Sequence, residues 1–234
     1  MITVSVVSHG HGKMVESLVE KLLEFPEVTS VILTLNIPEY LNIQNCSRIK
    51  VLRNFYPKGF GSNHNAAFNL CDTPYFCVLN PDISLQNNPF AKLIFTFHDA
   101  KIGLVAPLVK NTEGLIEDSA RHFLTLNSLL LRIFFRKSDS YRCVEGAGLF
   151  YPDWVAGMFM LFNSKIFERL KGFDEGYFLY VEDVDVCNRV WLSGYKVLIN
   201  QNVSVIHDAQ RASRRSFQHM AWHVKGLIRY FMKF

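Results

Sequence analysis

The sequence has no long hydrophobic run. Although 49% of its 234 residues are hydrophobic, the longest apolar candidate, around Leu129 to Phe135, is short and is interrupted by Arg132. A membrane-spanning helix needs about 20 apolar residues, so we expect none. No basic segment with an apolar core precedes the strand-like run that starts at Ile2, and we expect no secretory signal. These absences predict a cytoplasmic protein, peripheral at most at the inner face of the cytoplasmic membrane.

Paired cysteines are also missing. The chain has five cysteines and no C-x-x-C pair: Cys46, Cys71, Cys77, Cys143 and Cys187. A chain of this length buries enough apolar surface to fold without a disulfide or a structural metal. We therefore interpret the cysteines as reduced thiols of a cytosolic protein, and not as zinc ligands or a disulfide framework.

The familiar phosphate-binding loops are absent too. The segment from Gly59 to Asn65 fails G-x-G-x-x-G because position 64 is His, and it lacks the Lys-Ser/Thr of a P-loop. We interpret it as a tight loop into a helix, whose small residues allow close approach of a nucleotide. His219 and His223 have the spacing of zinc ligands, but no Glu follows His219, so we expect both on a solvent face.

A net positive charge is absent from the chain except near the C-terminus. Residues 201–234 hold six Lys/Arg and one acidic residue, a balance of +5, and the other residues hold 19 Lys/Arg against 20 Asp/Glu, a balance of −1. A local excess of this kind indicates phosphate or a membrane surface as the partner, and not general nucleic-acid binding.

The first half of the chain alternates strand and helix patterns. Strand-like runs cover 2–8, 31–35, 48–53 and 75–79, and helical spacing of apolar residues occurs at 15–23 and 66–70. This order predicts an α/β fold with a parallel sheet and helices on both faces. Ligands of such sheets bind beyond the carboxyl ends of the strands.

Polar clusters stand at those strand ends. Ser8-His9-Gly10, Asn36, Asn54 and Asn80-Pro81-Asp82 each follow a predicted strand, and we expect them to converge on one crevice. A carboxylate such as Asp82 can bind a divalent cation that bridges a diphosphate. The alternative is a plain turn, since Asn, Pro and Asp all form turns.

The second half is less regular. Residues 111–153 show no clear period, and we expect acceptor-side loops and short helices there. Trp154 to Phe162 is strand-like, and residues 183–193 predict a helix that Gly194 ends. One carboxylate of the Glu182-Asp183 pair is a candidate general base, although acidic residues in a first helical turn also suit the helix dipole. Asp185 is expected to pair with Arg189 four residues later.

A last cluster joins His207 to a basic segment. Neutral imidazole is a good ligand for a transition metal or Mn²⁺. Arg211, Arg214 and Arg215 follow in the sequence, and guanidinium groups hold phosphate oxygens in bidentate fashion. The alternative for this run is a solvated basic loop.

The order of these clusters resembles the family 2 glycosyltransferases of the GT-A fold, especially the bacterial rhamnosyltransferase-like branch. The matching segments are Val4 to Gly10, Asn54 to Asn65, Asn80 to Asp82, Trp154 to Gly157, Gly172 to Glu175, Tyr180 to Asp185, Arg189, Gly194-Tyr195 and His207. Asn80 stands where many relatives have the first acid of Asp-x-Asp, and Asn36 stands where many have an Asp for the nucleoside base.

The resemblance implies a Rossmann-like, mostly parallel sheet and an inverting, metal-dependent hexosyltransferase. Asp82 and His207 would bind Mg²⁺ or Mn²⁺, and Asp183, beside Glu182, would take the proton of the acceptor hydroxyl. Trp154, Gly157 and Glu182 would shape the sugar and acceptor pocket. The implied donor-binding residues are Ser8, His9, Asn36, Asn54, Gly59, Gly61, Asn65, Asn80, Asp82, Arg211, Arg214 and Arg215.

The implied donor is a nucleoside-diphosphate sugar of dTDP or UDP type, with L-rhamnose from dTDP-rhamnose as first choice. The acceptor would be a glycan or lipid-linked glycan of bacterial surface polysaccharide synthesis, such as O-antigen or capsule. Two alternatives are a non-catalytic nucleotide-sugar or glycan-binding module and a sugar nucleotidyltransferase. The second should carry an Arg- and Lys-containing Gly-rich loop, whereas residues 8–13 offer only Ser-His-Gly-His-Gly-Lys.

The expected organisation is one GT-A domain at 1–215, with a nucleotide-sugar half at 1–109 and an acceptor half at 110–215, followed by an amphipathic helix at 216–234. The apolar stripe of that helix comprises Phe217, Met220, Val224, Leu227, Ile228 and Phe231, beside a basic row of Lys225, Arg229 and Lys233. Trp222 and Tyr230 suit a membrane interface. The helix either rests on an anionic membrane near a lipid-linked acceptor or packs its stripe onto the domain.

Overall fold

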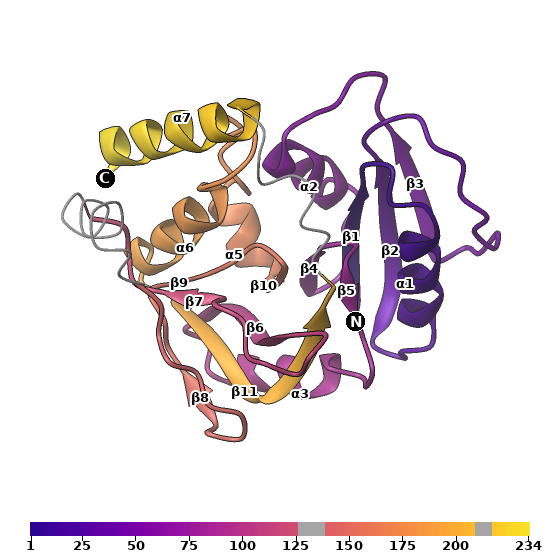
Figure 1. The fold of residues 1–234 in the computed structure, drawn as a ribbon. Coiled ribbons are helices and arrows are strands. Elements are labelled where there is room, and N and C mark those ends of the chain that lie inside the picture. Colours follow the sequence, from indigo (N-terminus) through magenta and orange to yellow (C-terminus); the bar gives the residue numbers. More distant parts are fainter. Residues whose placement is uncertain (126–138, 209–216) are drawn as a thin grey trace.

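We describe the fold from a computed structural model, for residues 1–125, 139–208 and 217–234. In these residues nine strands form one mixed sheet in the order β3-β2-β1-β4-β10-β6-β11-β5, with β8 paired to β11 (Figure 1). The strands are β1 (Ile2–Ser8), β2 (Val28–Leu35), β3 (Ile49–Arg53), β4 (Tyr75–Leu79), β5 (Ile83–Ser84), β6 (Ile102–Asn111), β8 (Leu149–Phe150), β10 (Phe159–Asn163) and β11 (Lys196–His207). A separate pair joins β7 (Ala120–Arg121) to β9 (Trp154–Val155).

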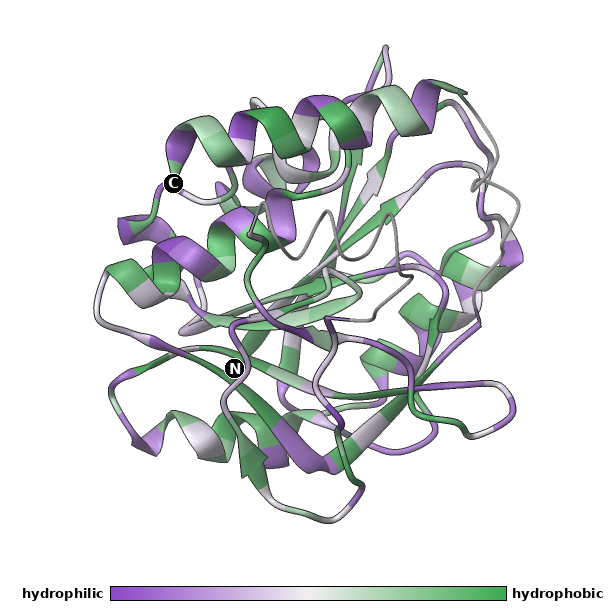
Figure 2. Cartoon of the chain, turned by 60° about the vertical axis from the view of Figure 1, so that its left-hand side comes forward, coloured by the Kyte–Doolittle hydropathy of each residue, from purple (hydrophilic) through white to green (hydrophobic). Residues whose placement is uncertain are grey.

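Helices cover both faces of the large sheet, as predicted. They are α1 (Lys13–Leu23), α2 (Phe60–Phe68), α3 (Phe90–Phe95), a 3-10 turn at Thr96–His98, α5 (Ser164–Arg169), α6 (Glu182–Leu192) and α7 (Phe217–Lys233). Apolar side chains of α1 and α3 belong to one buried core, whereas those of α2, α5, α6 and α7 belong to a second core. Figure 2 shows the hydrophobic strands between these layers.

Side-chain alternation along the strands separates the two cores. In β1, Val4 and Val6 point into the core beneath α1, while the hydroxyl of Ser5 lies 2.8 Å from Nδ1 of His64 in α2 on the other face. Successive side chains of a strand point to opposite faces, so the one strand serves both layers. β1 pairs in parallel with β2 and β4, and β2 with β3, which confirms the predicted order of the first half.

The second half departs from the expectation. β6 and β11, which the sequence pattern did not reveal, form the longest parallel pair, and β10 lies antiparallel between β4 and β6. Pro107 pairs with Asn200 where the ladder is irregular, between Asn200 and Ser204. A proline has no N–H for the ladder and is tolerated in a sheet at such bulges. The short helices expected at 111–153 are wrong for the described residues there, where the regular elements are β7 and β8.

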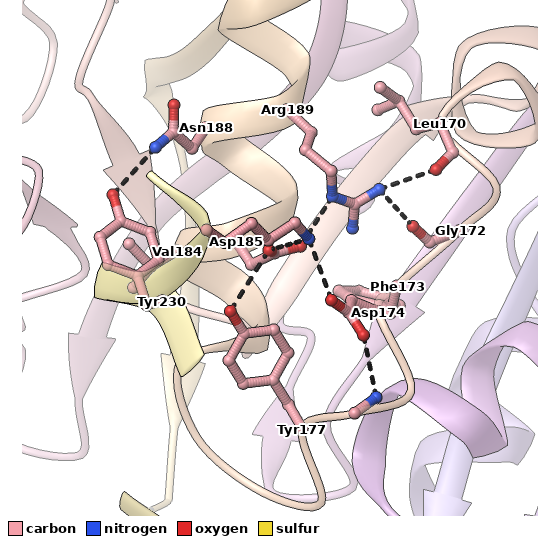
Figure 3. A network of polar contacts seen from close by, with 12 residues as sticks. Leu170, Gly172, Phe173, Asp174, Tyr177, Val184, Asp185, Asn188, Arg189 and Tyr230 are labelled. Atoms are coloured by element: carbon pink, nitrogen blue, oxygen red, sulfur yellow. Dashed lines mark hydrogen bonds and ion pairs between the residues drawn. The ribbon is translucent and has the colours of Figure 1, made fainter. Parts of the chain in front are cut away.

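A buried carboxylate joins α6 to its surroundings (Figure 3). Asp185 is fully buried, and its Oδ2 accepts a 2.7 Å hydrogen bond from Nε of Arg189, which confirms the predicted pair. Its Oδ1 lies 2.5 Å from Nζ of Lys233 in α7. Arg189 also donates to the carbonyl oxygens of Leu170 and Gly172, at 2.7 and 2.8 Å. One charge network therefore holds α6, α7 and the turn before Phe173 together.

The C-terminal helix packs through only part of its expected stripe. Gly226, Leu227, Tyr230 and Phe231 face the second core, whereas Phe217, Met220, Val224 and Ile228 are exposed. The interfacial role expected of Tyr230 is wrong, because this residue is buried and its Oη accepts a 3.0 Å hydrogen bond from Asn188. Among the described residues, no helix combines the length and apolar content that a membrane crossing needs.

Replacing Asp185 with alanine tests the network. We expect the free energy of unfolding to fall by about 3 to 5 kcal/mol, because the cationic groups of Arg189 and Lys233 then lose a buried counter-charge. Urea denaturation followed by circular dichroism measures the change. Glu24→Ala, which removes the exposed ion pair with Lys21, is the matched control and should lose much less. Equal losses in the two variants would show that the network does not hold α6 in place.

Candidate active site

One polar centre lies where β4 and β11 end. Asp82 follows β4, and His207 is the last residue of β11. The antiparallel pairing of His207 with Ile83 and the 2.8 Å hydrogen bond from the Asp208 N–H to the Asp82 carbonyl fix the two segments together. His207 Nε2 lies 3.1 Å from Oδ2 of Asp82. The two residues that the resemblance assigns to a metal, 125 positions apart in the chain, are thus in direct contact.

A residue that the sequence did not reveal completes this centre. Glu117 Oε2 lies 2.7 Å from Nδ1 of His207, so that the imidazole stands between two carboxylates. Burial lowers the pKa of His207, but hydrogen bonds and charge from Asp82 and Glu117 outweigh it, so the pKa lies above its usual value. The irregular sequence around Glu117 contains no pattern that predicts its contact with His207, which lies 90 positions away.

The donor set at this centre suits a hard divalent cation. Oδ1 of Asp82 is buried and has no hydrogen-bond partner, and an unpaired anionic oxygen beside an imidazole is a favourable cation ligand. No group of three or more His, Cys, Asp or Glu in the described ranges is arranged to hold a metal. A cation bound by Asp82 and His207 would therefore take its remaining oxygen ligands from other groups, such as a bound diphosphate.

A second centre lies at the start of α6. Asp183 accepts hydrogen bonds from the backbone N–H groups of Gly157 at 3.2 Å and Val184 at 2.9 Å. It borders a cavity of about 150 Å³. The cavity lining comprises Arg121, Leu124, Trp154, Tyr180, Val181, Glu182, Asp183, Val184, His223 and Leu227. Three expected pocket residues, Trp154, Gly157 and Glu182, thus lie at this cavity or bond directly to Asp183.

Burial raises the pKa of both acids at this centre. Burial, and then the negative charge of Asp183, raise the pKa of Glu182 to about 8. The pKa of Asp183 is also raised by burial, although the N–H groups of Val184 and Gly157 and the positive charge of Arg121 oppose the rise. Carboxyl groups with perturbed pKa values beside a cavity are candidates for acid–base catalysis.

The backbone that leads into this centre is strained. Tyr180 and Val181 have φ angles of 74° and 73°, in the left-handed region that non-glycine residues rarely adopt. Each such residue costs roughly 1 to 3 kcal/mol, and such strain collects at functional sites. The two angles place the Glu182-Asp183 pair against Gly157 at the first turn of α6.

Arg121 and His223 were not expected at this site. The Arg121 guanidinium lies 5.5 Å from the centroid of the Trp154 ring and bonds to Asp118 at 2.7 Å. Arg121 lies in a segment without periodicity, so no sequence signal marked it. His223 is exposed, as expected, but it lines the cavity, whereas His219 is half-buried and its Nδ1 lies 2.7 Å from the Tyr180 hydroxyl.

The predicted donor residues at the ends of β1 to β3 form a connected polar cluster. Asn36 is buried, and its Oδ1 accepts hydrogen bonds from Asn54 Nδ2 at 2.9 Å and from the Lys58 N–H at 2.8 Å. His9 Nδ1 lies 3.4 Å from Asn36 Nδ2. The Ser8 hydroxyl accepts a 3.3 Å hydrogen bond from the His11 N–H. These strand-end clusters therefore share one edge of the sheet, while the amide of Asn36 is already satisfied by protein groups.

The glycine-rich segment has a packing role. A Cβ on Gly59 would lie 2.6 Å from the Phe178 carbonyl oxygen, and a Cβ on Gly61 would lie 2.7 Å from Cβ of Phe173. Asn65 Nδ2 donates to the Phe173 carbonyl at 2.9 Å. The expectation that the small residues make room for a nucleotide is corrected: the room at these glycines is taken by the 173–178 segment. Donor contact by these three residues stays a prediction.

The two centres lie at the same edge of the sheet but border different cavities. The Asn80 N–H donates a 2.9 Å hydrogen bond to the Met158 carbonyl, and Met158 follows Gly157, which bonds to Asp183. This path connects the end of β4 to the start of α6. Asp82 borders a cavity beside α1, whereas Asp183 borders the cavity with Trp154. Arg211, Arg214 and Arg215 lie outside the described residues.

We compared the chain with families, sequences and solved structures of known proteins. No family model matches the chain. The chain is 29% identical to Rhamnosyltransferase WbbL of Escherichia coli (strain K12) over 245 residues, which covers 98% of this chain and 92% of that protein. It is 28% identical to the N-acetylglucosaminyl-diphospho-decaprenol L-rhamnosyltransferase of Mycobacterium tuberculosis (strain ATCC 25618 / H37Rv) over 163 residues, 64% of this chain and 52% of that protein.

Two solved structures share the fold. GalNAc-T7 with UDP, GalNAc and Mn²⁺ matches 89% of this chain with a TM-score of 0.67 and 15% identity. The mannosyltransferase PcManGT of Pyrobaculum calidifontis with GDP-Man and Mn²⁺ matches 97% with a TM-score of 0.65 and 14% identity. The chain spans 43% and 64%, respectively, of the length of those two proteins.

The fold and the comparisons place the chain among proteins with the GT-A glycosyltransferase fold. Within that class the chain is related to the rhamnosyltransferase WbbL. The predicted fold class is thereby confirmed, including the mixed, mostly parallel sheet with flanking helices.

The raised pKa of Glu182 has a consequence for stability. The folded protein holds this proton between the usual carboxyl value of 4.5 and about 8, whereas the unfolded chain releases it. Stability from this group is therefore present at low pH and is lost as the pH rises towards 8. Because glutamine does not titrate, Glu182→Gln should lose less stability than the parent protein over that interval. Denaturation midpoints at a series of pH values measure this, and parallel profiles would contradict the assignment.

Proposed function

We propose that this protein transfers a sugar with inversion from a nucleoside-diphosphate donor to a glycan or lipid-linked glycan, in the synthesis of a bacterial surface polysaccharide. The observation that carries the proposal is the carboxylate of Asp183, which the Gly157 N–H orients and which borders a cavity together with Glu182 and Trp154. L-Rhamnose from dTDP-rhamnose is the first choice of donor. It is supported by the identity of two relatives, Rhamnosyltransferase WbbL and an N-acetylglucosaminyl-diphospho-decaprenol L-rhamnosyltransferase.

Asp183 acts as the general base in this proposal. Its carboxylate accepts the proton of an acceptor hydroxyl, and the acceptor oxygen bonds to the anomeric carbon as the bond from that carbon to the diphosphate oxygen breaks. Attack occurs opposite the leaving group, which inverts the configuration. The N–H groups of Gly157 and Val184 orient the carboxylate and favour its charged form. Trp154 and Arg121 shape the sugar and acceptor side of the cavity.

Asp82 and His207 are the proposed ligands of a divalent cation, Mg²⁺ or Mn²⁺. Such a cation neutralises the charge that develops on a departing diphosphate. Glu117 holds Nδ1 of His207, so that Nε2 is directed to the side of Asp82. The free Oδ1 of Asp82 is the oxygen left for a ligand. The presence of Mn²⁺ in the solved structures of GalNAc-T7 and PcManGT is consistent with this role.

The remaining assignments follow the two halves of the chain. We infer that residues 1–109 bind the nucleotide sugar through Ser8, His9, Asn36, Asn54 and Asn80, and that residues 110–215 supply the acceptor side. By the resemblance, Arg211, Arg214 and Arg215 approach the diphosphate, and Gly59, Gly61 and Asn65 belong to the donor side. The five cysteines are free, which supports a cytoplasmic site of action.

Asp183→Asn tests the general base. We expect transfer to fall by about 10²- to 10⁴-fold, because the amide cannot accept the proton. Release of nucleoside diphosphate from dTDP-rhamnose measures the rate. The thermal stabilisation by donor and Mn²⁺ should persist, since the donor does not require this carboxylate. Asp99→Asn, at an exposed ion pair with Lys196, is the control. Full activity of Asp183→Asn would refute the proposal, and so would the absence of turnover by the parent protein with any donor. If the parent protein binds a donor but does not turn it over, the result favours a non-catalytic binding module.

Glu117→Gln tests the cation centre. Outer-shell partners of ligating histidines typically affect metal affinity by about 10- to 100-fold, and we expect a loss of that size for Mn²⁺ in the presence of dTDP. Electron paramagnetic resonance of free Mn²⁺ measures the affinity directly. Glu113→Gln is the matched control, because Glu113 lies on an exposed turn four positions from Glu117. This variant should retain the Mn²⁺ affinity of the parent protein. An unchanged affinity in Glu117→Gln would remove Glu117 from the proposal.

A further inference from the structure

α7 presents an apolar face to solvent. Phe217, Met220, Val224, Ile228 and Met232 are exposed, the first and last by 85% and 84%. Their spacing of three or four residues puts them in one stripe along the 17-residue helix. The residues that attach α7 to the protein lie on another side of the helix, since Gly226 and Tyr230 are buried. In Figure 1 the helix lies on the outside of the molecule, beyond α6.

Positive charge runs beside this stripe. Lys225, Arg229 and Lys233 each follow a stripe residue by one position, and α7 contains no acidic residue. These three cations border an open groove of about 500 Å³ together with Ile228, Met232 and the acidic Asp174. Arg229 pairs with Asp174, and Lys233 pairs with Asp174 and Asp185, yet the two basic side chains remain 46% and 33% exposed. An apolar stripe along a basic row is the pattern of helices that lie in a membrane interface.

The charge also distinguishes between two occupants of this face. In a twofold contact between copies the same patch meets itself, so α7 of the second copy would offer no acidic side chain to the basic row of the first. Like charges in an interface are unfavourable, whereas anionic headgroups complement them. We infer that the α7 stripe, defined by Phe217, Met220, Val224, Ile228 and Met232, docks onto the surface of an anionic membrane.

The location of the stripe connects docking to the active site. His223 and Leu227 line the cavity that Asp183 borders, and each precedes a stripe residue by one position. One position is a rotation of about 100° around a helix. The cavity therefore lies along one side of the stripe, and the basic row lies along the other side. Docking brings the cavity to the membrane surface, where a lipid-linked acceptor reaches Asp183; this last step rests on the proposed function.

Vesicle co-sedimentation of the whole chain tests the docking. The probes are vesicles of phosphatidylcholine alone and of phosphatidylcholine with phosphatidylglycerol. We expect binding to the anionic vesicles and at least about a tenfold loss of partitioning in Phe217→Ser/Ile228→Ser, because two inserted apolar side chains are removed. Lys225→Gln should weaken binding to the anionic vesicles only. Phe95→Ser/Leu192→Ser, which alters two exposed apolar residues outside α7, is the matched control and should bind as the parent does.

Two results would overturn the inference. One is that the parent protein sediments with neither kind of vesicle, or that the stripe variant sediments as well as the parent. The other is a concentration-dependent dimer, lost in the stripe variant, that accounts for the exposed face without vesicle binding. Thermal stabilisation by dTDP-rhamnose in the stripe variant shows that it is folded. Asp183→Asn should still bind vesicles, so a failure of docking and a failure of the proposed transfer give different results.

Discussion

The buried carboxylate of Asp185 is the interaction on which the second half of the molecule depends. It lies one turn inside α6, between the guanidinium of Arg189 and the ammonium of Lys233, while Arg189 reaches the carbonyls of Leu170 and Gly172. A buried ion pair is costly unless its remaining groups are hydrogen-bonded, and here almost all of them are. Because α6 begins with Glu182-Asp183, the network that holds this helix also sets the position of the proposed base.

The antiparallel strand β10 explains how the two centres share one edge of the sheet. It lies between β4 and β6, and it is entered from Gly157 and Met158. Met158 bonds to Asn80 at the end of β4, and Gly157 bonds to Asp183 at the start of α6. A short connection therefore spans from the residues near the cation centre to the residues near the acceptor cavity. The arrangement suits the proposed reaction, in which a diphosphate leaves on one side of the anomeric carbon and an acceptor hydroxyl attacks from the other side.

The active-site region carries costs that the rest of the fold must offset. Tyr180 and Val181 adopt left-handed backbone angles, Glu182 has a buried oxygen without a partner, and so does Asp82. Such features reduce stability and persist only where the surroundings enforce them. Both α7 and the 173–178 segment supply that enforcement, since Gly226 packs closely on Tyr180 and Val181, and Gly59 packs on Phe178. α7 is thus a wall of the acceptor cavity as well as a surface element.

The sequence by itself determined what depends on neighbours within a few residues or on a strict period. Three features are of this kind: the alternation of strands and helices in the first half, the helix α1 and the Asp185–Arg189 pair. Each follows from the spacing of residues that are close in the sequence. The motif order also singled out Asp82, Asp183 and His207 as candidate site residues. Only the tertiary structure decided the partners of those residues: Glu117 meets His207 across 90 positions, and Arg121 reaches Trp154 from a segment without a period. β6 escaped detection for a different reason: it is buried on both faces over most of its length, and such a strand lacks the alternation that marks an exposed face.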